Sequence, residues 1–245
     1  MSKMGLQIVT TIDSAENIMA KDAKLLEDLA VTQQPILHLY RFEAPSITYG
    51  HFITIDQMLK LDELKKEKIQ LAKRPTGGGI IFHLYDLAFS FLLPSSHPKF
   101  SMNTLDNYAY VNQIVKQAII PFIKDKSIDF LPLDPKDPTQ ATHFCMAKPT
   151  IYDVMIGDKK IVGAAQRKKN QGLLHQGSIA IQAPSKLLLE KILLNPDEIV
   201  PKMTAFSHYF LDSFASENEK EELIKNIQDS LLKHFQSALS ESSKN

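Results

Sequence analysis

The stretch KRPTGGGIIFH, residues 73–83, places three consecutive glycines between a basic pair and a run typical of a β-strand, in a chain with only 9 glycines. Neither common nucleotide loop is present, because no Lys-Ser or Lys-Thr pair follows the glycines and Phe82 replaces the third glycine of GxGxxG. Such a triplet can still present N–H groups to a carboxylate, carbonyl or phosphate and admit an extended ligand. The alternative is a flexible turn, but the flanking Arg74 and His83 favour an acyl or phosphoryl site.

Composition and charge limit the classes of protein to which the chain can belong. Lys plus Arg and Asp plus Glu both count 28, so no overall field would attract nucleic acid or an anionic membrane. No apolar run approaches the roughly 20 residues of a transmembrane helix, and MSKMGLQIVT lacks the apolar core of a signal peptide. We therefore expect a cytoplasmic protein. The length and the 44% hydrophobic content favour one large domain over two small ones.

The pattern of apolar residues predicts helices mixed with hairpins. Helical spacing or composition is found in segments 14–30, 55–68, from 101 onward, 185–194 and 218–239. Strand patterns occupy two parts of 36–50, predicted hairpins at 79–93 and 152–166, and segment 173–181. The apolar run LAFSFLL, residues 87–93, is expected to be central, and the prolines in 129–142 predict an exposed loop. Together these elements indicate α/β layers around a mixed or antiparallel sheet.

A second cluster of candidate residues lies between 144 and 181. The single cysteine, Cys145, excludes an internal disulfide and a multi-thiolate metal site, and no metal site is expected. Cys145 is either a small packing residue or a nucleophile, and an adjacent ammonium would stabilise its thiolate. Lys160 is either solvated at a turn or, because it opens the apolar strand KIVGAA, directed inward.

These motifs together resemble the biotin/lipoate protein ligase and octanoyltransferase superfamily. The segments that carry the resemblance are RPTGGGIIFH (74–83), DLAFS (86–90), GDKKIVGAAQ (157–166) and HQGS (175–178). Upstream, MAKD (19–22) is similar to the first-helix motif of the lipoate branch, and SITYG (46–50) to its strand ending in glycine. The resemblance covers about residues 15–205.

The resemblance implies an α+β catalytic domain of the class II aminoacyl-tRNA synthetase and biotin synthetase type. Its central sheet would be mixed, mostly antiparallel and flanked by helices. One domain is expected over 1–245, with a core at about 15–205 and a helical segment at about 206–245. Lys160 would contact the acyl carbonyl. The residues that would line the acyl site are Arg74, Thr76, Gly77, Gly78, Gly79, His83, Gly163, Ala164, His175, Gly177 and Ser178.

The segment CMAKPTIYD, residues 145–153, is similar to the cysteine-dependent branch, in which a cysteine lies seven residues before a Tyr-Glu or Tyr-Asp pair. It predicts transfer of a lipoyl or octanoyl group through a thioester on Cys145, with Lys160 stabilising the thiolate and no cofactor. Two alternatives stay open. One is an ATP-dependent lipoate-protein ligase that uses ATP and Mg, and the other is a non-catalytic protein that binds acyl groups or carriers.

The same resemblance implies the partners. Lipoyl domains of 2-oxoacid dehydrogenases or the glycine cleavage H protein would accept the acyl group, and acyl carrier protein or a lipoylated protein would donate it. Neither nucleic acid nor a membrane is expected. The basic residues Lys159, Arg167, Lys168 and Lys169 predict a strip on which an acidic carrier could dock, with a solvated hairpin end as the alternative.

Overall fold

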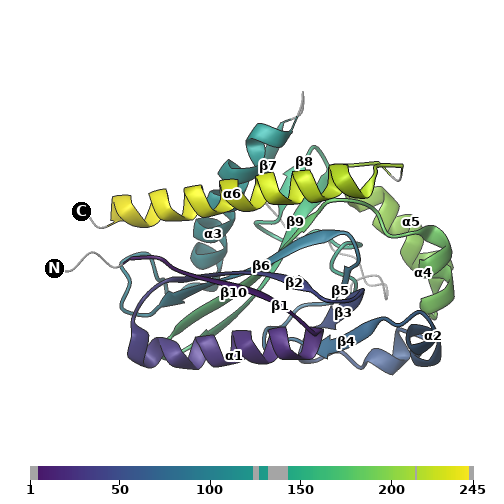
Figure 1. Cartoon of the computed structure of the whole chain (residues 1–245), viewed down its shortest axis with the longest axis horizontal. Helices are drawn as coiled ribbons and strands as arrows, with labels where there is room; N and C mark the ends of the chain where they lie inside the picture. Colours follow the sequence, from purple (N-terminus) through teal and green to yellow (C-terminus); the bar gives the residue numbers. More distant parts are fainter. Residues whose placement is uncertain (1–4, 124–126, 132–142, 213, 243–245) are drawn as a thin grey trace.

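The fold is centred on a large mixed sheet (Figure 1). A computed structural model describes residues 5–123, 127–131, 143–212 and 214–242. Every neighbouring pair of strands is antiparallel except β1 and β2, which confirms the predicted mixed, mostly antiparallel sheet. In spatial order the seven strands are β1 (Gln7–Asp13), β2 (Ile36–Phe42), β6 (Asp86–Pro94), β10 (Gly172–Ala180), β9 (Lys159–Lys169), β8 (Val154–Ile156) and β7 (Ile128–Phe130).

A second, three-stranded sheet carries the glycine-rich segment. Its order is β4 (Gln70–Lys73), β3 (Ser46–Tyr49) and β5 (Ile80–His83), with β3 parallel to β4 and antiparallel to β5. The hairpin predicted over 79–93 is therefore wrong, because β5 and β6 belong to different sheets. Strand β6 is buried along almost its whole length and pairs with β2 and β10, as the apolar run LAFSFLL predicted.

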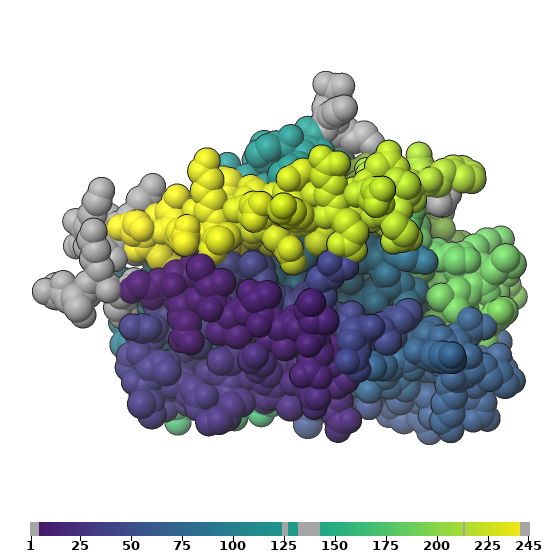
Figure 2. Space-filling model, in the orientation of Figure 1, coloured from purple at the N-terminus to yellow at the C-terminus, as the bar shows by residue number. Residues whose placement is uncertain are grey.

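Helices cover both faces of the large sheet (Figure 1). Helix α1 (Ala15–Thr32) lies on one face, and α3 (Thr104–Ile119) and α6 (Glu217–Ser242) pack together on the other. The apolar side chains of α6 that pack against the sheet and α3 are buried; they are Ile227, Leu231, Phe235 and Leu239. Figure 2 shows α6 as a continuous band beside the N-terminal segment. Arg41 of β2 donates a hydrogen bond to Glu221 of α6 at 2.7 Å. The proposed boundary near residue 205 stays a prediction.

The remaining helices surround the small sheet. These are η1 (Ile55–Gln57), α2 (Leu61–Lys66), α4 (Lys186–Ile192) and α5 (Pro196–Phe206), while η2 (Ile120–Phe122) extends α3. The continuous helix predicted over 55–68 is wrong, because Leu59 is buried and bridges to Leu193 between η1 and α2. Strands β1 and β4 and helix α5 were not predicted.

Part of the proline-rich segment is a strand. Strand β7 includes two residues of the loop predicted over 129–142, and residues 132–142 lie outside the described part of the chain. In the part that is described, no helix is both long enough and apolar enough to cross a membrane.

Candidate active site

The glycine loop, residues 75–79, is anchored by the guanidinium of Arg74. This buried group donates to Thr48 Oγ1 at 2.9 Å, to the carbonyl oxygen of Gly77 at 3.1 Å and to that of Gly79 at 2.6 Å. Burial lowers the pKa of Arg74, but a guanidinium remains charged in proteins. Arg74 therefore places a fixed cation behind the loop and holds its carbonyl groups.

The glycines serve different purposes within the loop. A Cβ on Gly79 would lie 2.2 Å from the carbonyl oxygen of His143, so Gly79 lets the segment that leads into Cys145 pack against the loop. Gly78 has a φ of +84°, a left-handed conformation that favours glycine. A Cβ on Gly77 would meet nothing within 4 Å. Of the three, Gly77 has open space where a Cβ would stand, and Gly78 is the most exposed.

Cys145, Lys160 and Asp153 form a compact group next to the loop. Lys160 Nζ lies 3.3 Å from Cys145 Sγ, 3.0 Å from the Cys145 carbonyl oxygen and 2.7 Å from Asp153 Oδ2. Lys160 is only 1% exposed, which confirms that it points inward, and Cys145 is half-buried. Asp153 Oδ2 also accepts from the Thr150 N–H at 2.6 Å and from its hydroxyl at 2.9 Å. Asp153 was not predicted as a site residue.

The charges of this group follow from its contacts. Burial opposes a charge on Lys160, but the Asp153 carboxylate and Cys145 outweigh it and raise the pKa of Lys160. Burial raises the pKa of Asp153, and Lys160 and Thr150 oppose that rise. Lys160 is accordingly an ammonium at neutral pH, directly beside the sulfur of Cys145.

Gly163 makes room for this arrangement. A Cβ on Gly163 would lie 2.5 Å from Lys160 Cε and 3.1 Å from Cys145 Sγ. In the sheet Gly163 is opposite Ser178, and its neighbour Ala164 is opposite Gly177. A side chain larger than hydrogen at Gly163 would push the ammonium away from the sulfur.

His83 belongs to a second polar group, which Thr48 links to Arg74. His83 Nδ1 lies 2.7 Å from Asp86 Oδ2 and Nε2 lies 2.8 Å from Thr48 Oγ1. An ionised Asp86 carboxylate can only accept, so the Nδ1–H of His83 donates to it, and in the neutral ring Nε2 then accepts from the Thr48 hydroxyl. Asp86 also accepts from Ser178 at 2.6 Å. The structure thus brings His83 and Ser178 together around one carboxylate.

Thr76 of the glycine loop is held by a buried polar network. Its hydroxyl donates to Gln176 Oε1 at 2.6 Å, and Gln176 Nε2 donates to Asp22 Oδ2 at 2.6 Å. Asp22 also contacts His38 at 2.7 Å and Ser90 at 2.5 Å. The sequence motifs contained Asp22 and Gln176, but no spacing rule connects residues from α1, β10 and the loop.

His175 and Gly177 lie on the other face of the large sheet. Side chains alternate along a strand, so Gln176 and Ser178 face the loop while His175 packs near Phe89 and Tyr108 of the opposite face. A Cβ on Gly177 would lie 2.4 Å from the Phe89 ring. Burial lowers the pKa of His175 to about 3. Neither residue is brought to Cys145, so their predicted place in the acyl wall has no contact to support it.

The predicted basic strip is wrong for Lys159, which begins β9, whereas Arg167, Lys168 and Lys169 lie together at the other end of that strand. Arg167 reaches the glycine loop and donates to the Pro75 carbonyl oxygen at 2.9 Å. The three lysines have partners in separate parts of the chain. Their partners are the Met102 carbonyl oxygen for Lys168, Glu27 for Lys169 and the Thr204 carbonyl oxygen for Lys159.

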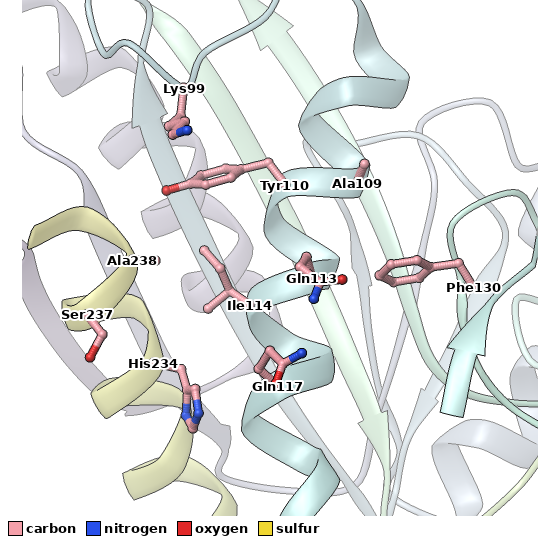
Figure 3. A pocket seen from close by; sticks show the side chains of 10 residues that line it. All are labelled: Lys99, Ala109, Tyr110, Gln113, Ile114, Gln117, Phe130, His234, Ser237 and Ala238. Carbon is pink, nitrogen blue, oxygen red and sulfur yellow. The ribbon is translucent and has the colours of Figure 1, made fainter. Parts of the chain in front are cut away.

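Cavities of different size border these groups, and the cavity between α3 and α6 shares no lining residue with them. A groove of about 580 Å³ lies between α1 and the glycine loop and is lined by Lys73, Arg74 and Arg167 among others. A void of about 20 Å³ beside Met146 and Ser178 has room for about one water molecule. A cavity of about 750 Å³ lies between α3 and α6 (Figure 3). An eight-carbon chain beside Met146 would require neighbouring side chains to move.

The chain is similar to known proteins of one family. A family model described as lipoyl protein ligase A/B catalytic domain matches residues 14–236. Octanoyltransferase LipM of Carboxydothermus hydrogenoformans is 23% identical over 225 residues, which cover 92% of this chain and 82% of the relative. Octanoyltransferase LipM of Staphylococcus aureus is 23% identical over 193 residues, covering 76% and 68% respectively.

Solved structures share the fold. Lipoate-protein ligase A bound with ATP has a TM-score of 0.69 at 23% identity, covering 96% of this chain and 86% of that one. A bi-partite lipoate protein ligase from Thermoplasma acidophilum has a TM-score of 0.67 at 22% identity, covering 96% and 84%. These likenesses confirm the predicted fold class, that of the lipoate-protein ligases. With the family model matching most of its length, the chain belongs to the lipoyl protein ligase A/B catalytic domain family.

Proposed function

We propose that this protein transfers an octanoyl or lipoyl group to a lysine of lipoyl carrier domains through a thioester on Cys145. The observation that carries the proposal is the 3.3 Å contact between Cys145 Sγ and the buried ammonium of Lys160. An adjacent cation stabilises the thiolate, which is the form of cysteine that attacks acyl groups. The curated relatives named octanoyltransferases support acyl transfer as the reaction class.

In the first half-reaction, the Cys145 thiolate attacks the carbonyl carbon of an acyl thioester on a donor. A bond forms between that carbon and Sγ, and the bond to the donor sulfur breaks. The donor leaves as a thiolate and takes a proton from water. One thioester replaces another, so the step needs neither ATP nor a metal.

The negative charge that develops on the carbonyl oxygen needs hydrogen-bond donors. We assign this role to the N–H groups of Gly77 and Gly78, which donate to no described residue. Arg74 holds the carbonyl groups of Gly77 and Gly79, which orients the loop. Thr76 and Gly79 fix its two ends, and His83 and Ser178 border the space beside it. Ala164, His175 and Gly177 would act only through packing.

In the second half-reaction, the neutral amine of the acceptor lysine attacks the acyl-enzyme. An amide bond forms, the bond to Sγ breaks, and the amine gives up one proton. That proton passes to solvent, either directly or by way of the departing sulfur, and the Cys145 thiolate is restored. We expect lipoyl domains of 2-oxoacid dehydrogenases or the glycine cleavage H protein as acceptors, acyl carrier protein or a lipoylated protein as donor, and the cytoplasm as the compartment.

Labelling tests this proposal against its two alternatives. Incubation with octanoyl carrier protein should produce a hydroxylamine-sensitive adduct on Cys145 by mass spectrometry, and Cys145→Ser should lose it. Pyrophosphate release from ATP and Mg with free lipoate, persisting in Cys145→Ser, would instead identify a ligase. Binding of the carrier without either signal would identify a non-catalytic protein. Either of the last two results would overturn the proposal.

A further inference from the structure

The ammonium of Lys160 has three acceptors around it. They are the carboxylate of Asp153, the carbonyl oxygen of Cys145 and the sulfur of Cys145, at 2.7, 3.0 and 3.3 Å. An ammonium carries three hydrogens and a neutral amine only two. Lys160 can therefore donate to all three acceptors at once only while it is charged.

Asp153 is the group that stabilises this charge in a buried place. Lys160 and Asp153 are 1% and 2% exposed, and a buried ammonium without a counter-charge loses its proton readily. The sulfur of Cys145 cannot serve as the counter-charge throughout the reaction, because it becomes part of a neutral thioester in the acyl-enzyme. In the acyl-enzyme Asp153 is the negative group that remains next to Lys160.

Hydrogen bonds hold the segment before Asp153 in a conformation that directs the Asp153 carboxylate at Lys160. Tyr152 adopts a φ of +66°, a conformation that is unfavourable for a residue with a bulky side chain. Its carbonyl oxygen accepts from the buried Asn112 of α3 at 2.8 Å, and its N–H donates to Leu131 at 3.1 Å. Thr150 adds two hydrogen bonds to the carboxylate itself. The backbone strain and the anchors on both sides direct Asp153 at Lys160.

We propose that Asp153 is a positioning residue that keeps Lys160 charged and aimed at Cys145 through both half-reactions. The inference rests on the proposed function and deepens it. Lys160 then acts as a fixed cation and never as the proton acceptor. The proton released by the acceptor amine passes to solvent, either directly or by way of the departing sulfur, and no step requires Lys160 to change its charge.

The protonation of Lys160 can be measured directly. Protein labelled with ¹³C at lysine Cε is titrated by NMR, and the Lys160 signal is identified by its loss in Lys160→Met. In the wild type, Lys160 should stay protonated above the range in which ordinary lysines titrate, near pH 10.4. In Asp153→Asn its midpoint should fall by about 3 units or more. A wild-type Lys160 that titrates at or below the ordinary range would overturn the proposal, even if Asp153→Asn does not fold.

The reactivity of Cys145 supplies a second measurement. Iodoacetamide should alkylate Cys145 at pH 7 at least 10-fold more slowly in Asp153→Asn than in the wild type, since the sulfur loses its cation. Thr150→Val keeps the carboxylate and should show a smaller loss. Asp129→Asn is the matched control, because Asp129 pairs with Lys116 at 3.1 Å but is 82% exposed, and it should leave the rate unchanged.

The outcomes separate this inference from the proposed function. Neither the NMR titration nor the alkylation uses an acyl donor, so both report on Asp153 even if the enzyme proves to be a ligase. Equal or faster alkylation in folded Asp153→Asn would overturn the inference, because Lys160 would then keep its charge without Asp153. Failure of the wild type to form an acyl-enzyme would overturn the proposed function alone.

Discussion

Replacing Gly163 with alanine should remove activity while leaving the fold in place. The new Cβ would lie 2.5 Å from Lys160 Cε, whereas carbon atoms pack at about 3.5 Å or more. Lys160 would have to retreat by about 1 Å, and its 3.3 Å contact with Cys145 Sγ would be lost. A misplacement of about 1 Å in an active site costs roughly 100-fold in rate.

The backbone of Gly163 lies outside the left-handed region, so alanine suits the strand. The assay is the rate of acyl-enzyme formation on Cys145 followed by mass spectrometry, together with the midpoint of thermal unfolding. Gly177→Ala is the matched comparison, because its Cβ would clash with the buried Phe89 ring at 2.4 Å. It should cost about 1–3 kcal/mol of stability by overpacking. Wild-type acylation by Gly163→Ala would refute the reasoning.

Three further predictions concern single contacts. Arg167→Glu should slow transfer, because Arg167 donates to the glycine loop, whereas Lys168→Glu should have a smaller effect in the same assay. His175 is neutral when folded, with its pKa lowered from 6.5 to about 3, so the unfolded chain binds more protons as the pH falls below 6.5. Because of His175, the free energy of unfolding should fall by about 1.4 kcal/mol for each pH unit as the pH is lowered from 6 to 4. In urea titrations, His175→Asn should reduce this dependence on pH. Asp22→Ala should lower the free energy of unfolding by about 1–3 kcal/mol for each buried partner that it leaves unpaired. Asp28→Ala, at an exposed ion pair on the same helix, should lower it by less than about 1 kcal/mol.

Each of these has a result that would contradict it. Equal rates for Arg167→Glu and Lys168→Glu would remove the role of Arg167 at the loop. An unchanged pH slope in His175→Asn would mean that His175 is not buried neutral. Equal stability losses at Asp22 and Asp28 would mean that the network behind Thr76 is not a buried one.

Local patterns explain why most elements could be predicted. Helices α1, α3 and α6 repeat apolar residues at helical spacing, and β8 and β9 flank the turn at Gly157 and Asp158. The pairing of β5 could not be predicted in this way. A hairpin and a crossover between two sheets have the same local sequence, and the edge that a strand joins depends on strands far away in the chain.

The motifs alone are enough to single out Cys145, Lys160 and the glycine loop as candidate site residues. They could not distinguish the two faces of β10, on which Ser178 reaches Asp86 but His175 packs near Phe89. A sequence motif includes every residue of a stretch, whereas a strand directs alternate side chains to opposite faces of the sheet. Asp153 was missed for a related reason, because its contact with Lys160 depends on how the segment before β8 turns.

The sequence by itself determined the family, the candidate nucleophile and its lysine, because these are carried by residue types at short spacings. Only the tertiary structure decided what the glycines in KRPTGGGIIFH are for. Gly79 admits the backbone that leads to Cys145, and Gly77 borders open space. It also decided that a buried carboxylate accompanies Lys160, since the contact joins two segments through the packing around them and no local pattern specifies that distance.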